Sequence, residues 1–324
     1  MALITRYGSL FGEIPQTTGR MYFVAPAASY TVDGRAYAAS DGNDGLHPER
    51  AVLTVQRGID LCTADVGDTV VLLAGTHTQT ATINVNKAGI TIWGVAASEH
   101  TFNRHAGANS DNARAVVDMT GTSDELLNIT VAGVELGFLV LRGTSAFSCF
   151  SFQTTDAMDG LYFHDLVVDQ SLGVPSLDTR GIDFGNRRGG VGHARLTLGS
   201  QEPVGRATAY LERVTVINRG ANGEGVHLAT GHFWVKDCKI DNRGGTWASP
   251  FVWATSAVGQ AEQVIFVNAG TLSSGMTSAG QTGTGVTIIN CRFASATSDI
   301  YGLASATAIT SYEPTSGGTL SVVG

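Results

Sequence analysis

The chain has 324 residues, of which 43% are hydrophobic, and it carries a formal net charge of -8 at pH 7. This length allows either one long solenoid or two ordinary domains with a sizeable core. The acidic balance argues against a nucleic-acid surface, since such surfaces are basic. The absence of any run of about 18 apolar residues argues against a transmembrane helix.

Residues 1–20 show neither a helical nor a strand period, although apolar side chains recur along them. Apolar residues exposed on such an arm need a partner. Either the arm packs along its own chain, or it docks onto another subunit or assembly. Arg6 and Glu13 interrupt the segment, so it lacks the apolar centre of a signal peptide and none is expected.

Residues 21–66 are expected to contain a first strand, a loop and a capping helix. The strand is 21–24, and the loop ends at 39–45 with Asp and Asn side chains beside glycines. We interpret this loop as a set of turns with side-chain hydrogen bonds. It does not match a calcium loop, because the twelfth position from Asp41 is Val52, which cannot act as a ligand.

A helix is predicted to begin at Pro48, since proline is favoured in the first helical turn. Such a helix would cover the open end of the following strands and prevent edge pairing. Its apolar face would contain Val52, Val55, Ile59 and Cys62.

From residue 67 to 295 a short strand pattern returns at a nearly constant interval. Strands beginning at 214, 238, 264 and 291 are 24, 26 and 27 residues apart. Further members begin at 69, 90, 115, 139 and 166, and 194–198 would fill the 48-residue gap before 214. Alternating apolar residues indicate strands, and repeats of about 20–50 residues indicate a solenoid with one continuous core.

The predicted fold is therefore all-β: a parallel β-helix, a solenoid of about ten rungs, with an N-terminal capping helix. A β-sandwich or barrel also has many short strands, but its turns come every 8–12 residues or so without a longer repeat. Residues 296–324 are expected to form a C-terminal tail. No CxxC pair is present, so we expect reduced core cysteines, and neither a metal nor a cofactor. The cysteines are Cys62, Cys149, Cys238 and Cys291.

Several segments resemble the N-terminal part of pectin-lyase-like β-helix proteins. They are 39–45, 54–60, 67–70, 74–77 and 89–94. The resemblance implies a right-handed parallel β-helix. It leaves the function open, because this superfamily includes polysaccharide lyases, glycoside hydrolases, epimerases, adhesins and phage tailspikes. The arm followed by these motifs also resembles virion structural proteins of tailed bacteriophages.

The resemblance implies two kinds of catalytic site. Lyases of this fold use a Lys or Arg base, often with Ca²⁺ held by Asp, and hydrolases use carboxylates that face one groove. Asp159, Asp183 and Glu224 could line one groove across neighbouring rungs; the alternative is that they are solvated turn residues. Asp165 and Asp169 are roughly 13 Å apart along one strand, too far for paired glycosidase carboxylates.

An aromatic group near one rung would form either a sugar-stacking platform or a packing or subunit contact. It consists of Trp234, Trp247, Phe251 and Trp253.

The leading functional hypothesis is a non-enzymatic virion protein, a capsid-decoration or fibre/spike component anchored to other virion proteins by its N-terminal arm. We expect it in the virion, assembled in the host cytoplasm, as a homo-oligomer and preferably a trimer. The alternatives are a carbohydrate-active enzyme, such as a depolymerising tailspike, and a glycan-binding adhesin. Surface polysaccharide is the partner that both alternatives imply.

Overall fold

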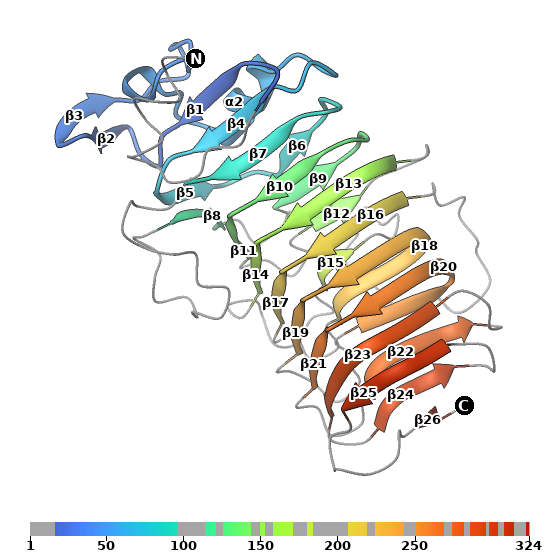
Figure 1. Ribbon diagram of the computed structural model, residues 1–324. Helices are drawn as coiled ribbons and strands as arrows, with labels where there is room; N and C mark the ends of the chain where they lie inside the picture. Colours follow the sequence, from blue (N-terminus) through green and yellow to red (C-terminus); the bar gives the residue numbers. More distant parts are fainter. Residues whose placement is uncertain are drawn as a thin grey trace.

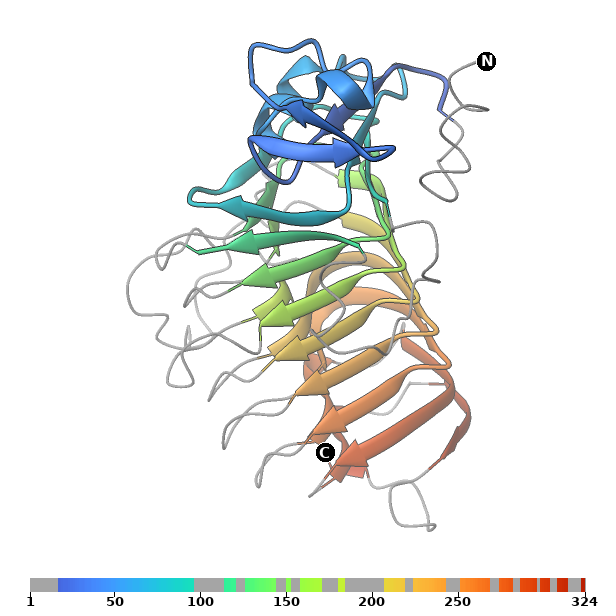
Figure 2. The same ribbon diagram turned by 90° about the vertical axis from the view of Figure 1, so that its left-hand side faces the viewer.

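The alternating apolar residues fold into short parallel strands, and each strand pairs with its equivalents in the windings before and after it (Figure 1). The computed structural model describes residues 17–95, 114–120, 126–143, 150–152, 158–170, 180–183, 207–218, 224–242, 251–268, 274–281, 286–295, 298–303, 308–313 and 322–323. In these residues one parallel sheet coils around an apolar interior and forms a rod (Figure 2). The predicted parallel β-helix is confirmed.

Each winding contributes strands to three faces, which we name A, B and C. Face A contains ten described strands; the first and the last lie outside residues 67–295, for which about ten rungs were predicted. They are β1 (Met21–Val24), β4 (Thr69–Leu72), β7 (Thr91–Gly94), β10 (Glu135–Gly137), β13 (Met158–His164), β16 (Ala207–Glu212), β18 (Glu224–Lys236), β20 (Phe251–Glu262), β23 (Val286–Ser295) and β25 (Ala308–Glu313).

Faces B and C complete each winding. Face B consists of β5 (Gly75–Gln79), β8 (Ala115–Met119), β11 (Val140–Gly143), β14 (Val167–Gln170), β17 (Thr215–Asn218), β19 (Lys239–Asn242), β21 (Ile265–Asn268) and the end of β23. Face C consists of β6 (Ile83–Val85), β9 (Leu127–Ile129), β12 (Phe150–Phe152), β15 (Arg180–Asp183), the first parts of β18 and β20, β22 (Ser274–Gln281), β24 (Ser298–Leu303) and β26 (Val322–Val323).

The corner between faces A and B repeats the same turn in successive windings. A non-glycine residue there has a positive φ, a left-handed conformation that side chains other than Asn and Asp seldom adopt. The residues with φ between 50° and 58° at this corner are Phe138, Asp165, Arg213, Asp237, Gln263 and Asn290. Backbone hydrogen bonds hold the turns in line, as from Asp165 N to Glu212 O at 3.1 Å. Corner side chains of adjacent windings therefore lie next to one another.

The residue after each corner points into the interior and is buried. Val214, Cys238 and Val264 occupy this position in three consecutive windings, and their neighbours pair as Thr215 with Lys239 and Lys239 with Ile265. The predicted column of inward residues is thus confirmed. Cys238 and Cys291 are free, buried thiols within it.

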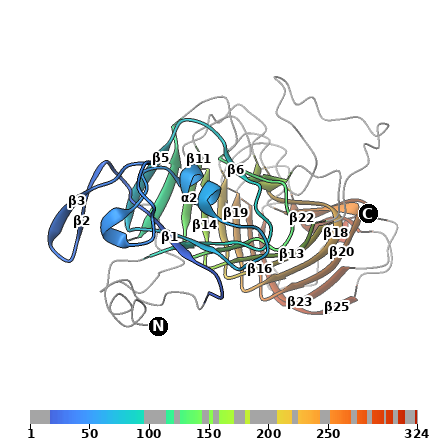
Figure 3. The same cartoon turned by 90° about the horizontal axis from the view of Figure 1, so that it is seen from above.

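The N-terminal end of the rod is covered as expected, but by a shorter helix. A 3-10 turn, η1 (Pro48–Arg50), comes first, and the α-helix α2 (Val55–Leu61) begins only after Thr54, whose hydroxyl caps it. Val52 lies between them in an isolated parallel bridge to Val24, which stops the predicted helix from starting at Pro48. Figure 3 shows α2 at this end of the rod, where it contacts β1, β4 and β6. Neither described helix is long and apolar enough to cross a membrane.

An antiparallel hairpin that the sequence analysis missed covers the outside of the first windings. It consists of β2 (Ser29–Val32) and β3 (Arg35–Ala38). Tyr30 and Val32 pack there with Phe23 and Val71 in a second apolar cluster, separate from the interior. The outer surface of face A is therefore covered at its N-terminal end.

The interval of 48 residues before 214 is one winding, not two. β14 pairs directly with β17, Val167 opposite Thr215, so no strand lies between them. The predicted strand at 194–198 lies outside the described residues. The predicted series also mixed two faces. Its strands at 69 and 91 belong to face A, whereas those at 115 and 139 belong to face B.

The sheet extends beyond both predicted limits. β1 pairs with β4, so the parallel sheet begins at residue 21. β24, β25 and β26 continue the pairing in the described residues 298–303, 308–313 and 322–323, where a tail was expected. Both predicted limits follow the visible repeat, which misses most strands of each winding.

Candidate functional site

Three aromatic side chains lie in register on the outer surface of face A. Tyr162 pairs with Tyr210 and Tyr210 with Trp234 in successive windings, while their neighbours Phe163, Leu211 and Val235 point inward and are buried. Adjacent strands are about 4.8 Å apart, so the backbone positions that carry the rings follow the rod axis at that interval. We call Tyr162, Tyr210 and Trp234 the aromatic strip.

The aromatic strip becomes more exposed towards Trp234. Tyr162 and Tyr210 are half-buried, with ring centroids 5.6 Å apart. Trp234 is 39% exposed, and Val66 is the other large hydrophobic residue found exposed among the described side chains. His232 lies beside Trp234, at a centroid distance of 6.4 Å. The row of aligned rings that ends in an exposed tryptophan is a candidate binding surface.

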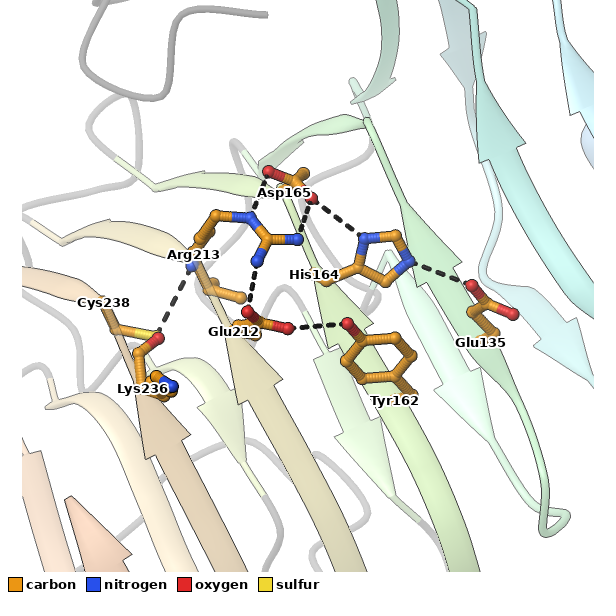
Figure 4. Close-up of polar contacts among 9 residues, drawn as sticks. Glu135, Tyr162, His164, Asp165, Glu212, Arg213, Lys236 and Cys238 are labelled. Carbon is orange, nitrogen blue, oxygen red and sulfur yellow. Dashed lines mark hydrogen bonds and ion pairs between the residues drawn. The ribbon is translucent and has the colours of Figure 1, made fainter. Parts of the chain in front are cut away.

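A set of paired charges adjoins the strip where face A turns into face B (Figure 4). We call it the corner network: Glu135, Tyr162, His164, Asp165, Glu212 and Arg213. It links three successive windings, because Glu135 belongs to β10, His164 to β13 and Glu212 to β16.

His164 is the centre of the corner network. Its Nε2 lies 3.0 Å from Oε1 of Glu135, and its Nδ1 lies 3.0 Å from Oδ2 of Asp165. A neutral imidazole has only one N–H, whereas the imidazolium can donate to both carboxylates. Burial opposes that charge, but the hydrogen bonds and charges of Asp165 and Glu135 outweigh it and raise the pKa of His164. The ring also stacks on Tyr162, at a centroid distance of 4.5 Å.

Arg213 connects the next winding to this centre. Its Nε and Nη2 donate to the two oxygens of Asp165 at 2.8 and 2.7 Å, and its Nη1 donates to Glu212. Such bidentate pairs are among the strong hydrogen bonds of proteins. Burial alone would raise the pKa of Asp165, but His164 and Arg213 lower it to about 2. Bonding to Asp165 in turn raises the pKa of the Arg213 guanidinium.

The corner network also fixes Tyr162 in the aromatic strip. The hydroxyl of Tyr162 donates to Oε2 of Glu212 at 2.7 Å. Burial and then Glu212 raise the pKa of Tyr162 to about 12, so the phenol stays protonated at neutral pH. The ring is held at one end by its backbone, at its hydroxyl by Glu212, and on one side by His164.

The sequence-predicted carboxylates are distributed over two faces. Asp159 is exposed at the start of β13 and accepts a hydrogen bond from Thr208 at 2.8 Å. Asp183 pairs in register with His227 on face C, and Glu224 pairs with Arg180 three positions earlier. The side chains of Asp183 and Glu224 lie outside the described part of the structure. No group of three or more described His, Cys, Asp or Glu side chains is arranged to hold a metal ion.

The predicted aromatic group does not lie together on one face. Trp234 is on face A, whereas Phe251 and Trp253 pair with Val226 and Leu228 on face C. Trp247 lies outside the described residues. The residues of the aromatic strip that the sequence analysis missed are Tyr162 and Tyr210.

The loop at 39–45 contains the predicted side-chain hydrogen bonds. Oδ1 of Asp41 accepts from the backbone N–H groups of Leu53 and Thr54, each at 2.9 Å. Asp44 accepts from Leu46 N at 3.2 Å and forms an ion pair with Arg50. These bonds tie the loop to the start of α2.

Comparison with known proteins identifies the fold and goes no further. No protein-family model and no curated protein matches the chain. Among solved structures it is similar to the crystal structure of pectate lyase Pel9A, with 12% sequence identity and a TM-score of 0.54, over 92% of this chain and 79% of that one. At this identity the likeness concerns architecture alone. The chain thus has the right-handed, pectin-lyase-like parallel β-helix fold.

Proposed function

We propose that this protein binds polysaccharide along the outer surface of face A without cleaving it. The observation that carries this proposal is the aromatic strip, three rings aligned with the rod axis of which Trp234 is 39% exposed. Aromatic rings with a polar edge offer a large apolar face together with a hydrogen-bonding group. The C–H faces of successive sugars in a chain can stack on rings repeated at the strand spacing.

The corner network supports binding over turnover. A general acid or base must release or accept a proton near the working pH. Both nitrogens of His164 are hydrogen-bonded to carboxylates, and Arg213 is bonded to Asp165 and Glu212. The lowered pKa of Asp165 and the raised pKa of Arg213 move both groups away from neutrality.

Binding can be tested by affinity electrophoresis in gels containing soluble glucans, galactans or polyuronates. Trp234→Ala and Tyr210→Ala should each weaken binding about tenfold, corresponding to about 1.4 kcal/mol. Val66→Ala removes the other large hydrophobic side chain exposed in the described part of the chain, just before β4, and should leave binding unchanged. Equal binding by the wild type and both strip variants would rule out the strip as the site.

The same samples test the enzyme alternative. Reducing ends and unsaturated-uronide absorbance should stay at background with every polysaccharide. If either product accumulates and disappears in Asp159→Ala, Asp183→Ala or Glu224→Ala, the protein is an enzyme and our proposal is wrong.

We also propose that the rod is a spike, fibre or decoration component of a virion, attached through residues 1–20. In support, residues 17–20 are bound to the turn before β4: Gly19 N donates to Gly67 O at 3.1 Å and Arg20 N to Asp68 Oδ1 at 2.6 Å. A partner that holds the arm would therefore hold the N-terminal end of the rod.

Deleting residues 1–16 leaves these bonds intact and should give a folded rod that no longer joins particles. Normal incorporation of the truncated protein would reject the anchoring role. The expected trimer is tested separately by light scattering on both proteins.

A further inference from the structure

We infer that the aromatic strip selects uncharged glycans and rejects polyuronates. This inference rests on the proposed binding function and concerns the class of ligand. The evidence is a second column of outward side chains on face A, which lies two positions after the aromatic strip along each strand.

Charges of alternating sign fill this second column beside the strip. Glu212 pairs in register with Lys236, and Lys236 with Glu262, in three successive windings. All three side chains are half-buried. The register places Lys236 between Glu212 and Glu262, and opposite charges on neighbouring strands attract. Gln260 donates from Nε2 to Oε2 of Glu262 at 3.2 Å and helps to orient it.

Two of the cationic groups beside the strip, His164 and Arg213, already form ion pairs with carboxylates. His164 bonds Glu135 and Asp165, and Arg213 bonds Asp165 and Glu212. A uronate that approached the strip would meet Glu212 and Glu262 without displacing these pairs. Tyr210 lies in the same field: after burial, Glu212 and then Glu262 and Asp237 raise the pKa of its phenol, against Lys236.

The hydrogen-bonding groups of the second column suit hydroxyls. Glu212 and Glu262 can only accept hydrogen bonds, whereas Lys236 can only donate them. A sugar hydroxyl does both, so an uncharged chain stacked on the strip can bond to all three groups. A ligand carboxylate can only accept, and beside Glu212 or Glu262 it adds like-charge repulsion, which costs binding energy.

The test compares polymers that differ only in charge. Binding constants are measured for soluble glucans and galactans and, for each, the polymer with C6 hydroxymethyl groups oxidised to carboxylates. We expect the oxidised polymer to bind at least about tenfold more weakly in dilute buffer. The difference in binding between the neutral and the oxidised polymer should narrow at about 1 M salt, where the screening length falls to about 3 Å.

Matched variants connect the preference to the second column. Glu262→Gln should reduce severalfold the ratio of the binding constant of the neutral polymer to that of the oxidised polymer. Asp33→Asn removes the same charge from the distant β2–β3 turn, where Asn tolerates the positive φ, and should leave the ratio unchanged.

The outcomes separate the two proposals. If an oxidised polymer binds as tightly as its neutral parent, charge selection is wrong, whereas polysaccharide binding stands. If the wild type binds none of the polymers, both are wrong.

Discussion

His164 lies with its Nε2 3.0 Å from Oε1 of Glu135, a residue 29 positions earlier in the chain and one winding away. Since its other nitrogen faces Asp165 at the same distance, the bonded form of the ring is the imidazolium. The corner network thus joins neighbouring windings by charge, outside the apolar interior. Its strength must depend on pH.

Stability should fall as the pH rises above about 6.5, the unfolded pKa of histidine. The folded pKa of His164 is raised above its unfolded value of about 6.5. Its contribution is therefore fully present below about 6.5 and is lost as the pH rises through the folded pKa. Urea unfolding midpoints measured from pH 5 to pH 9, at intervals of about one pH unit, will show this loss of stability. His164→Gln should lower the midpoint at pH 6 and flatten its decline at higher pH.

His77 provides the matched control. It is buried in the interior, its Nε2 lies 2.8 Å from Leu73 O, and burial lowers its pKa to about 4. A histidine with a lowered pKa reduces stability only at acid pH. His77→Gln should therefore leave the decline of the unfolding midpoint at higher pH unchanged. A wild-type midpoint that stays constant between pH 6 and 9 would contradict the imidazolium assignment.

Acid should weaken the corner network through Asp165. Its folded pKa of about 2 lies below the unfolded value of about 3.9, so its contribution is present above about 3.9 and is lost as the pH falls towards 2. Asp165→Asn should destabilise the protein at pH 7 by about 1.5–3 kcal/mol, the range for hydrogen bonds to charged groups. The exposed Asp33→Asn should have little effect. Equal unfolding midpoints for the two variants at pH 7 would contradict this role.

Gly137 makes room for His164, so Gly137→Ala should destabilise the fold. A Cβ at this position would lie 2.7 Å from Cε1 and 2.8 Å from Nε2 of His164. The imidazole ring must shift to admit the added methyl, and overpacking of this kind typically costs about 1–3 kcal/mol. Gly42→Ala, whose Cβ meets only the Ser40 hydroxyl at 3.5 Å, should be tolerated. Melting temperatures at pH 6 will compare the two, and an unchanged value for Gly137→Ala would show that the ring can move freely.

The sequence predicts this fold well because one feature of each winding repeats. An inward apolar residue follows the corner turn, and the spacing of Val214, Cys238 and Val264 along the chain is enough to reveal the interval. Strands on the other faces have weaker patterns, and long excursions between them change the interval. For this reason the sequence pattern alone predicts two windings before 214, where the chain forms one.

The two tyrosines of the aromatic strip were missed, although the repeat contained their signal. Tyr162, Tyr210 and Trp234 each lie four positions before the inward residues 166, 214 and 238, so an alignment of the windings extended backwards would have placed them in one column. The carboxylates Asp159, Asp183 and Glu224 were instead grouped by winding without regard to face. The face on which a residue lies depends on the geometry of the turns before it, which the sequence pattern does not specify.

The inward column makes a last prediction about cysteine reactivity. Cys238 Sγ lies 3.1 Å from Lys236 O in the interior, and burial raises its pKa to about 12; burial likewise raises the pKa of Cys62 to about 12 and of Cys291 to about 11. The thiolate is the reactive form, so iodoacetamide at pH 8 should label these three cysteines more than about 100-fold more slowly in the native protein than in urea. Mass spectrometry of digested samples assigns each site and keeps Cys149 separate. Rapid native labelling of Cys238 would mean that the windings open at the corner, and the column could not then be the closed core that the rod requires.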